Sequence, residues 1–242
     1  MKNMINWLEP QSRRFCGIAF AAIIMFFLAG CGDGSGGGSN NYFEFDSASR
    51  TIIGYDDDGP KNVTLPSTID GIRVTAVGKN AFRDKQLTGV SILTGIITIG
   101  EGAFAENKLT SVTLLDSVIT IGVSAFKDNQ LETVIIPNSV IIIGNEAFAN
   151  NHLSVVIIGN SVTSIGNEAF AVNQQLDSIV IPNNVTGIGE DAFSGSPLTR
   201  VTIGPNKNYA LNIVPNFGTV YNNNGKQAGT YTWVDSSTWT KQ

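Results

Sequence analysis

The sequence predicts a β-rich repeat solenoid built from coils of 22 residues. The hexapeptide IGNEAF occurs at residues 143–148 and again at 165–170. Alignment on Ala-Phe gives units that begin at residues 87, 109, 131, 153 and 176, a step of 22 residues and once of 23. Each unit contains two short apolar alternations of the kind that half-buried strands show. Because one such coil cannot bury its own apolar face, a fixed period of this length indicates stacked coils.

Residues 1–30 are predicted to be a signal peptide. Arg13 and Arg14 precede the apolar stretch FCGIAFAAIIMFFLAG, which is shorter than the roughly 20 residues that span a bilayer. The small residues before Cys31 resemble the lipobox of bacterial lipoproteins, which implies a lipid on Cys31 and anchoring to a membrane. An ordinary secretory signal, or a weak membrane anchor, is the alternative. Residues 31–41 are then the lipidated cysteine and a flexible Gly/Ser tether.

Charge and cysteine content exclude several classes of function. Without the predicted signal peptide, 12 basic and 19 acidic residues remain, a net charge of about −7. No basic stripe is available to neutralise phosphates, which argues against a nucleic-acid partner. Cys16 leaves with the signal peptide and Cys31 carries lipid, so neither a disulfide nor a zinc-thiolate site is expected. Stability must therefore come from the apolar core.

The flanks of the repeat read as caps. Residues 42–62 are predicted to form an N-terminal hairpin cap, with strands at 42–45 and 51–55. The solenoid follows over residues 63–204, with a divergent first copy. Residues 205–242 are predicted to form a C-terminal β module that shields the last open edge. Its aromatic residues are Tyr209, Phe217, Tyr221, Tyr231, Trp233 and Trp239.

Two residue columns recur at the repeat period and are predicted to lie inside the coils. The first is an aromatic column, Phe82, Phe104, Phe126, Phe148, Phe170 and Phe193. The second follows three residues later and consists of Asn107, Asn129, Asn151 and Asn173, with Lys85 and Ser196 at the ends. An inward-facing asparagine can pair backbone groups that a bend leaves unsatisfied.

The consensus L-x-x-V-x-I-P-x-x-V-x-x-I-G-x-x-A-F-x-x-N resembles the BspA-like leucine-rich repeat, also called the Treponema-type repeat, over about residues 42–203. That resemblance implies a curved solenoid of the leucine-rich-repeat type. It also implies a bacterial protein of the cell envelope, at the outer membrane or cell surface, with a role in adhesion. Leu93 and Leu115 replace the consensus proline and the array is short, so the multivalent adhesion of long members is not carried over.

No arrangement of residues points to catalysis, a cofactor or a metal. His152 is the only histidine and lies in a variable loop, where a solvent-facing role is expected. The DDDG segment at residues 56–59 is the best cation candidate, but it lacks the spaced ligands of a calcium loop, and a charged turn is favoured. Glu146, Glu190 and Asp191 fall at repeat surface positions. The sequence therefore predicts a protein that is not an enzyme.

A binding surface is predicted on the outer face of the L-x-x-V-x-I strands. If Val and Ile of this segment face inward, the residues between them face outward and make an apolar patch on the central coils. The candidate residues are Thr133, Ile135, Val155, Ile157 and Val180. The alternative is that β-branched residues only favour strands.

The predicted function is a lipid-anchored, non-catalytic recognition protein that binds a protein or glycan through a solenoid face. Two alternatives remain open at this point. One is a structural or assembly protein of the cell envelope. The other is carbohydrate binding through Trp233 and Trp239 of the C-terminal module.

Overall fold

The computed structural model describes residues 42–205, 224–235 and 238–242. The chain divides into two compact units, Met1–Gly38 and Ser39–Gln242, and every described residue lies in the second. That unit contains the whole described apolar core, so it has what an independently folding domain needs. The predicted signal peptide, Cys31 and the tether lie outside the described residues. So do Tyr209, Phe217, Tyr221 and the side chain of Trp233.

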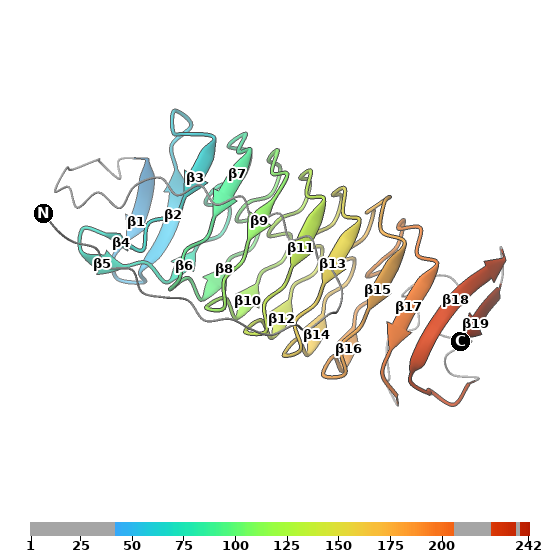
Figure 1. Ribbon diagram of the computed structural model, residues 1–242. Coiled ribbons are helices and arrows are strands. Elements are labelled where there is room, and N and C mark those ends of the chain that lie inside the picture. The colour runs from blue at the N-terminus through green and yellow to red at the C-terminus, as the bar shows by residue number, and fades with distance from the viewer. Residues whose placement is uncertain (1–41, 206–223, 236–237) are drawn as a thin grey trace, which may run out of the picture. The chain divides into compact units, whose positions relative to one another are not determined.

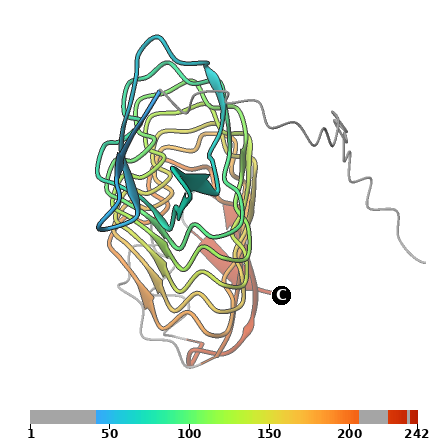
Figure 2. The same ribbon diagram turned by 90° about the vertical axis from the view of Figure 1, so that its left-hand side faces the viewer.

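The described unit is a β-solenoid, which confirms the predicted fold class (Figure 1). Its regular elements are all strands, and the described ranges contain no helix. Figure 2 looks along the array from the side of its first strands and shows the coils stacked behind one another around a common interior. Each coil contributes one short strand to each of two faces.

One face is an eight-stranded sheet in the order β1-β2-β6-β8-β10-β12-β14-β16. From β2 onward its strands are parallel and in register at the repeat step, for example Thr120 with Ile142. The bounds are β1 (Phe43–Asp46), β2 (Thr51–Tyr55), β6 (Ala76–Val77), β8 (Thr98–Ile99), β10 (Thr120–Ile121), β12 (Ile142–Ile143), β14 (Ser164–Ile165) and β16 (Gly187–Ile188).

The opposite face carries the L-x-x-V-x-I strands and is divided into three sheets, β3-β7-β9, β11-β13 and β15-β17-β18-β19. The first seven of these strands follow one another side by side in Figure 1. Their bounds are β3 (Asn62–Thr64), β7 (Gly89–Ser91), β9 (Val112–Thr113), β11 (Thr133–Ile135), β13 (Val155–Ile157), β15 (Ser178–Val180) and β17 (Arg200–Ile203).

The two ends of the array are closed by antiparallel pairs. At the start β1 pairs with β2, close to the predicted hairpin, and β2 then pairs in parallel with β6. The extra residues of the first coil form a small pair, β4 (Thr68–Ile69) with β5 (Ile72–Arg73). At the other end β18 (Gly229–Asp235) lies antiparallel between β17 and β19 (Thr238–Lys241). Tyr231 and Trp239 of this pair are buried in the core.

The phenylalanines at the repeat position form a continuous stack inside the coils. All six side chains are fully buried. Neighbouring ring centroids lie 5.0–5.4 Å apart with interplanar angles of 5–16°, an offset-stacked arrangement that aromatic pairs favour. Tyr55 and Phe43 of the first hairpin continue the stack beyond Phe82. IGNEAF recurs because every coil needs the same aromatic core residue.

The asparagines three residues later form a hydrogen-bonded ladder between coils. The Asn129 amide donates to the carbonyls of Phe104, Phe126 and Lys127, at 2.9, 3.1 and 3.2 Å, and its Oδ1 accepts from Leu109 N at 3.0 Å. Asn107, Asn151 and Asn173 repeat these contacts in their own coils. Each Asn therefore pairs backbone groups of its own coil with those of the preceding coil, at a bend where no ladder partner exists.

Candidate binding surface

The predicted patch residues lie together on the outer face of β11, β13 and β15. Ile135, Val155, Ile157 and Val180 are exposed by 57, 46, 50 and 61%, and Thr133 is exposed as well. Between them Val134, Val156 and Ile179 point inward and are buried. This alternation follows from the two-residue period of a strand, so the same segments supply both the core and the surface. We call the five exposed residues the apolar patch.

Cross-strand pairing makes the part of the apolar patch on β11 and β13 continuous. β11 and β13 are parallel, with Thr133 opposite Val155 and Ile135 opposite Ile157. Val180 lies on the next strand and is paired on its far side with Thr202 of β17. Four aliphatic side chains that are about half exposed on adjacent strands are unusual on a surface that faces only water.

A shallow groove of about 270 Å³ lies on the side of the apolar patch toward β17. It extends over β13, β15 and β17, and the sheet ladder is interrupted between β13 and β15. The coil that leads into β15 is one residue longer than the coil before it, since two residues separate Asn173 from Leu176 where one separates Asn151 from Leu153. The groove is lined by Ser154, Val155, Val156, Ser178, Ile179, Val180, Arg200 and Thr202.

Charged side chains border the apolar patch at the start of its strands. Glu132 precedes β11, Asp177 precedes β15 and Arg200 begins β17, and all three are exposed. No ion pair of the described residues involves any of the three. The border therefore offers two acidic groups and one guanidinium that are available to a partner.

The sequence analysis missed a second exposed apolar row, on the outer face of the eight-stranded sheet. Ile97, Ile119, Ile141 and Ile142 lie on or beside β8, β10 and β12 and are 40–45% exposed. The sequence contains a signal for this row, because in three successive coils an isoleucine follows the first buried residue of the V-x-x-I segment. Thr163 and Thr186 occupy this position in the next two coils, so the row ends at β12.

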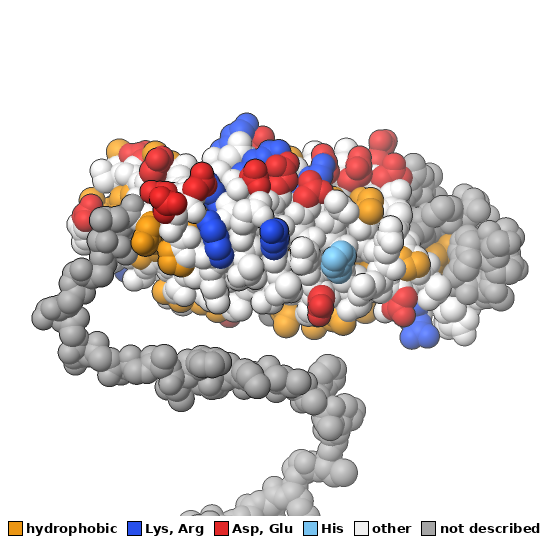
Figure 3. Space-filling view, turned by 90° about the horizontal axis from the view of Figure 1, so that it is seen from above, with side chains coloured by type: hydrophobic (Ala, Val, Ile, Leu, Met, Phe, Trp, Pro, Cys, Tyr) orange, Lys and Arg blue, Asp and Glu red, His pale blue; other side chains and the backbone are white. Residues whose placement is uncertain are grey.

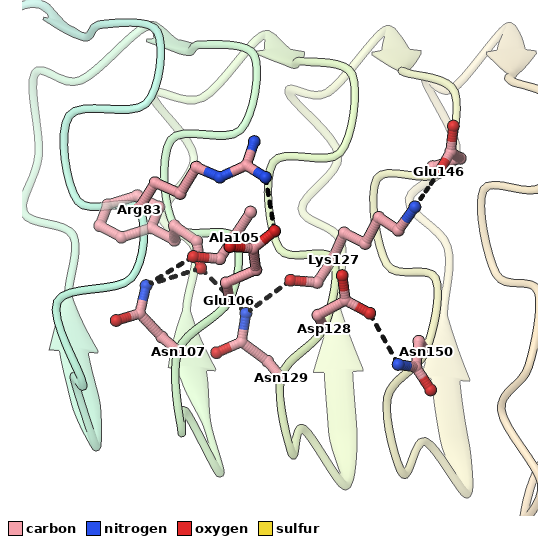
Figure 4. A network of polar contacts seen from close by, with 10 residues as sticks. Arg83, Ala105, Glu106, Asn107, Lys127, Asp128, Asn129, Glu146 and Asn150 are labelled. Carbon is pink, nitrogen blue, oxygen red and sulfur yellow. Dashed lines mark hydrogen bonds and ion pairs between the residues drawn. The ribbon is translucent and has the colours of Figure 1, made fainter.

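The ridge of turns that follows each recurring glycine is charged and internally paired. Figure 3 shows acidic and basic side chains gathered along one side of the array. Figure 4 shows that Arg83 pairs with Glu106 and Lys127 with Glu146, each across adjacent coils. The hydrogen bond to Glu146 raises the pKa of Lys127, and partial desolvation opposes this rise. Because these charges largely satisfy one another, the ridge reads as solvated surface.

The remaining chemical candidates lie in surface loops and turns. His152 is an exposed loop residue beside a shallow depression lined also by Asn150, Val172 and Gln175. In the DDDG segment, Asp58 N donates to Asp56 Oδ1 at 3.0 Å, as in a tight turn, and Asp57 pairs with Lys85 of the next coil. No group of three or more potential metal ligands is found among the residues described.

Comparison with known families agrees with this geometry. A family model described as the BspA type leucine rich repeat region matches residues 75–200 in 6 copies. The chain belongs to this family. The matched residues include the aromatic stack from Phe82 to Phe193, the asparagine ladder and the apolar patch. No curated protein matches the chain.

Two solved structures share the BspA-type fold. One is the pneumococcal vaccine antigen PcpA, with 24% identity and a TM-score of 0.53 over 63% of this chain and 42% of that one. The other is a leucine rich cell surface protein from Faecalibacterium prausnitzii A2-165, with 24% identity and a TM-score of 0.51 over 82% of this chain and 58% of that one. The chain thus spans about two fifths and three fifths of their lengths.

Proposed function

We propose that this BspA-type protein is a non-catalytic recognition protein of the bacterial cell surface. In this proposal it is anchored by a lipid on Cys31 and binds a protein partner through the apolar patch. The observation that carries the proposal is the exposure of Ile135, Val155, Ile157 and Val180 on adjacent strands, beside a shallow groove. Exposure of apolar surface to water costs free energy, and a partner that covers the surface lowers the free energy.

The chemistry of the apolar patch favours a protein over a glycan. Its side chains are aliphatic, whereas sugars are commonly held by stacking on aromatic rings. The aromatic alternative in the C-terminal module has lost one of its two residues, because Trp239 is only 3% exposed and belongs to the core. The side chain of Trp233 lies outside the described residues. We therefore assign recognition to the patch and a packing role to Trp239.

Display outside the cell is supported by two features of different kinds, a sequence motif and the descriptions of two structural relatives. The lipobox at Cys31 is the sequence feature that predicts a lipid anchor. Of the two structural relatives, one is described as a vaccine antigen and the other as a cell surface protein. Within the part of the chain that the structure describes, no helix is long and apolar enough to cross a membrane. Under this proposal the lipid supplies the attachment.

The location is tested by protease shaving of intact cells of the source organism. An antibody against residues 42–242 follows the solenoid, and a periplasmic protein serves as the control. Cleavage of the solenoid with an intact control supports display on the surface. Protection until the envelope is opened overturns it and places any partner inside the envelope.

The binding face is tested by site-specific photo-crosslinking on cells. Ile157 is replaced by p-benzoylphenylalanine in one strain, and the exposed Thr186 of the opposite sheet in a second strain. We expect a discrete adduct from position 157 and none from position 186. No adduct at position 157, or the same adduct at both positions, would overturn recognition by the apolar patch.

A further inference from the structure

We infer that the apolar patch binds a second copy of this chain, face to face, about a two-fold axis that runs parallel to the strands between β13 and β15. This inference rests on the proposed function, since it names the partner of the same surface. The observation that supports it is the arrangement of the border charges, because rotation about that axis brings an acidic group of each copy to a basic group of the other.

Glu132 and Arg200 have opposite charges, and each lies on the second strand from the proposed axis. The strands follow in the order β11, β13, β15 and β17, with Glu132 at the start of β11 and Arg200 at the start of β17. A two-fold axis parallel to the strands reverses this order and keeps the strand direction. It therefore places β11 against β17 of the second copy with their starting ends together. Glu132 of each copy then faces Arg200 of the other, so an isologous interface gains two ion pairs.

The same operation pairs the apolar residues. Ile157 of β13 faces Val180 of β15 in the second copy, and the reverse contact is equivalent. Val180 also lines the groove, whose walls come from β13, β15 and β17. Asp177 faces Ser154 of the second copy, so no like charges are brought together. The most exposed aliphatic side chains near the centre are thereby covered.

Neighbouring registers are disfavoured by charge. With the axis on β13, Glu132 of each copy faces Asp177 of the other, and both are acidic. With the axis on β15, the two copies of Asp177 face each other. With an axis perpendicular to the strands, the starting ends point in opposite directions and Glu132 and Arg200 no longer meet. One register is therefore favoured and its neighbours are opposed, which is how specific interfaces are commonly built.

The interface is small, which sets the expected affinity. Four short strands cover less than the roughly 1,200 Å² in total that standard stable complexes bury, so the free protein should dimerise weakly. Attachment of both copies to one membrane would raise their effective concentration and compensate for this. The surface is thus suited to lateral association of anchored copies.

Reciprocal charge reversal tests the inference with the unit Ser39–Gln242. Sedimentation equilibrium at concentrations up to about 1 mM measures the dissociation constant of the dimer. Glu132→Arg alone and Arg200→Glu alone each create two like-charged pairs, and we expect each to raise the dissociation constant by about tenfold or more. An equimolar mixture of the two variants restores both ion pairs and has the same summed net charge as two wild-type copies. We expect the mixture to dimerise as the wild type does.

Controls separate the specific contact from general effects. Glu190→Arg makes the same charge change as Glu132→Arg on the exposed ridge, and it should leave dimerisation unaltered. Far-UV circular dichroism and thermal unfolding show whether each variant is folded. A wild type that stays monomeric, or a mixture that fails to recover dimerisation, overturns self-recognition. A hetero-adduct at position 157 in the crosslinking experiment without a homo-adduct also overturns it while leaving recognition by the patch intact, whereas no adduct overturns both.

Discussion

At the scale of single residues, two positions in each coil adopt a left-handed backbone conformation. The second residue after the recurring glycine and the second after the phenylalanine adopt positive φ in most coils, for example Glu146 at 55° and Asn150 at 53°. Only glycine, and less readily asparagine and aspartate, adopt this region without strain. The sequence indicated a turn at each glycine. It did not indicate the left-handed positions, because Ser, Glu, Asp, Asn and Val all occupy them.

Val172 is the residue least suited to its backbone, and its replacement should stabilise the protein. It is β-branched, has a φ of 57° and is 43% exposed, so it combines strain with little burial. We expect Val172→Asn to raise the free energy of unfolding by about 1 kcal/mol, measured by urea unfolding. Val123→Asn is the matched control, since Val123 is 41% exposed and its φ is not positive. Equal effects of the two substitutions would rule out backbone strain as the cause.

Interruption of the asparagine ladder should lower the stability of the fold. Asn129 is only 6% exposed and makes hydrogen bonds to four backbone groups. Asn129→Ala removes all four hydrogen bonds and leaves the buried Leu109 N without a partner, while the three carbonyls keep bonds from neighbouring groups. We expect a loss of about 3 kcal/mol in the free energy of unfolding. Asn160→Ala, at an exposed loop position, should change it by less than about 0.5 kcal/mol. Similar losses from the two variants would show that the ladder adds no stability.

At the scale of the elements, strand packing depends on how closely adjacent coils approach. A Cβ added to Gly144 would lie 2.6 Å from the carbonyl carbon of Gly122, whereas one added to Gly187 would meet nothing nearer than Ser164 Oγ at 4.0 Å. Both glycines belong to the V-x-x-I-G segments of the eight-stranded face. The repeat pattern alone treats Gly144 as a turn residue, but the structure shows that it also permits backbone contact between coils.

This difference predicts that replacement of glycine by alanine has opposite effects on stability at the two positions. We expect Gly144→Ala to lower the free energy of unfolding by about 2 kcal/mol or more, because the neighbouring backbone must move. Gly187→Ala should be neutral or stabilising by up to about 1 kcal/mol, because it restricts the unfolded chain and has free space around it. Urea unfolding of both variants decides the matter. An equal loss in both would mean that coil spacing adjusts without cost.

The turn between β2 and β3 is tied to the next coil by an ion pair with a defined pH dependence. The hydrogen bond from Lys85 lowers the pKa of Asp57 below its ordinary value of 3.8. A carboxylate whose pKa is lowered on folding adds stability above the unfolded pKa, and this is lost as pH falls through the folded pKa. We expect Lys85→Met to return the pKa of Asp57 toward 3.8, measured by NMR titration, with Asp46 as the unaffected reference. An unchanged Asp57 midpoint would assign the lowering to another cause.

At the scale of the whole molecule, the repeated array could be predicted from the sequence. The breaks between its sheets and the packing of its last strands could not. The 22-residue period was enough to predict the solenoid, and the spacing of Phe82 to Phe193 was enough to expect one column. It was not enough to predict where the sheets of the second face break, because every coil has nearly the same pattern there. The burial of Trp239 and the pairing of β18 with β17 depend on contacts between segments without a repeat, so no period reports them.

Stacked coils interact only with their neighbours, so whole coils should be removable without loss of the fold. Deletion of residues 109–130 joins Lys108 to Leu131, and deletion of residues 131–152 joins Gln130 to Leu153. Each deletion removes 22 residues and recreates a native junction between an asparagine-type loop and a leucine. We expect both proteins to unfold cooperatively, with urea m-values lowered by roughly the share of one coil.

The two deletions should differ in recognition, and this difference separates the surface from the array. Removal of residues 109–130 keeps β11, β13, β15 and β17 adjacent, so the apolar patch and its border charges are preserved. Removal of residues 131–152 takes away β11, and with it Glu132 and Ile135. We expect the first protein to dimerise and crosslink through Ile157 as the full chain does, and the second to do neither. If both lose association equally, recognition depends on the length of the solenoid. If both retain it, the binding face lies elsewhere, and the row of Ile97, Ile119, Ile141 and Ile142 is the next surface to test.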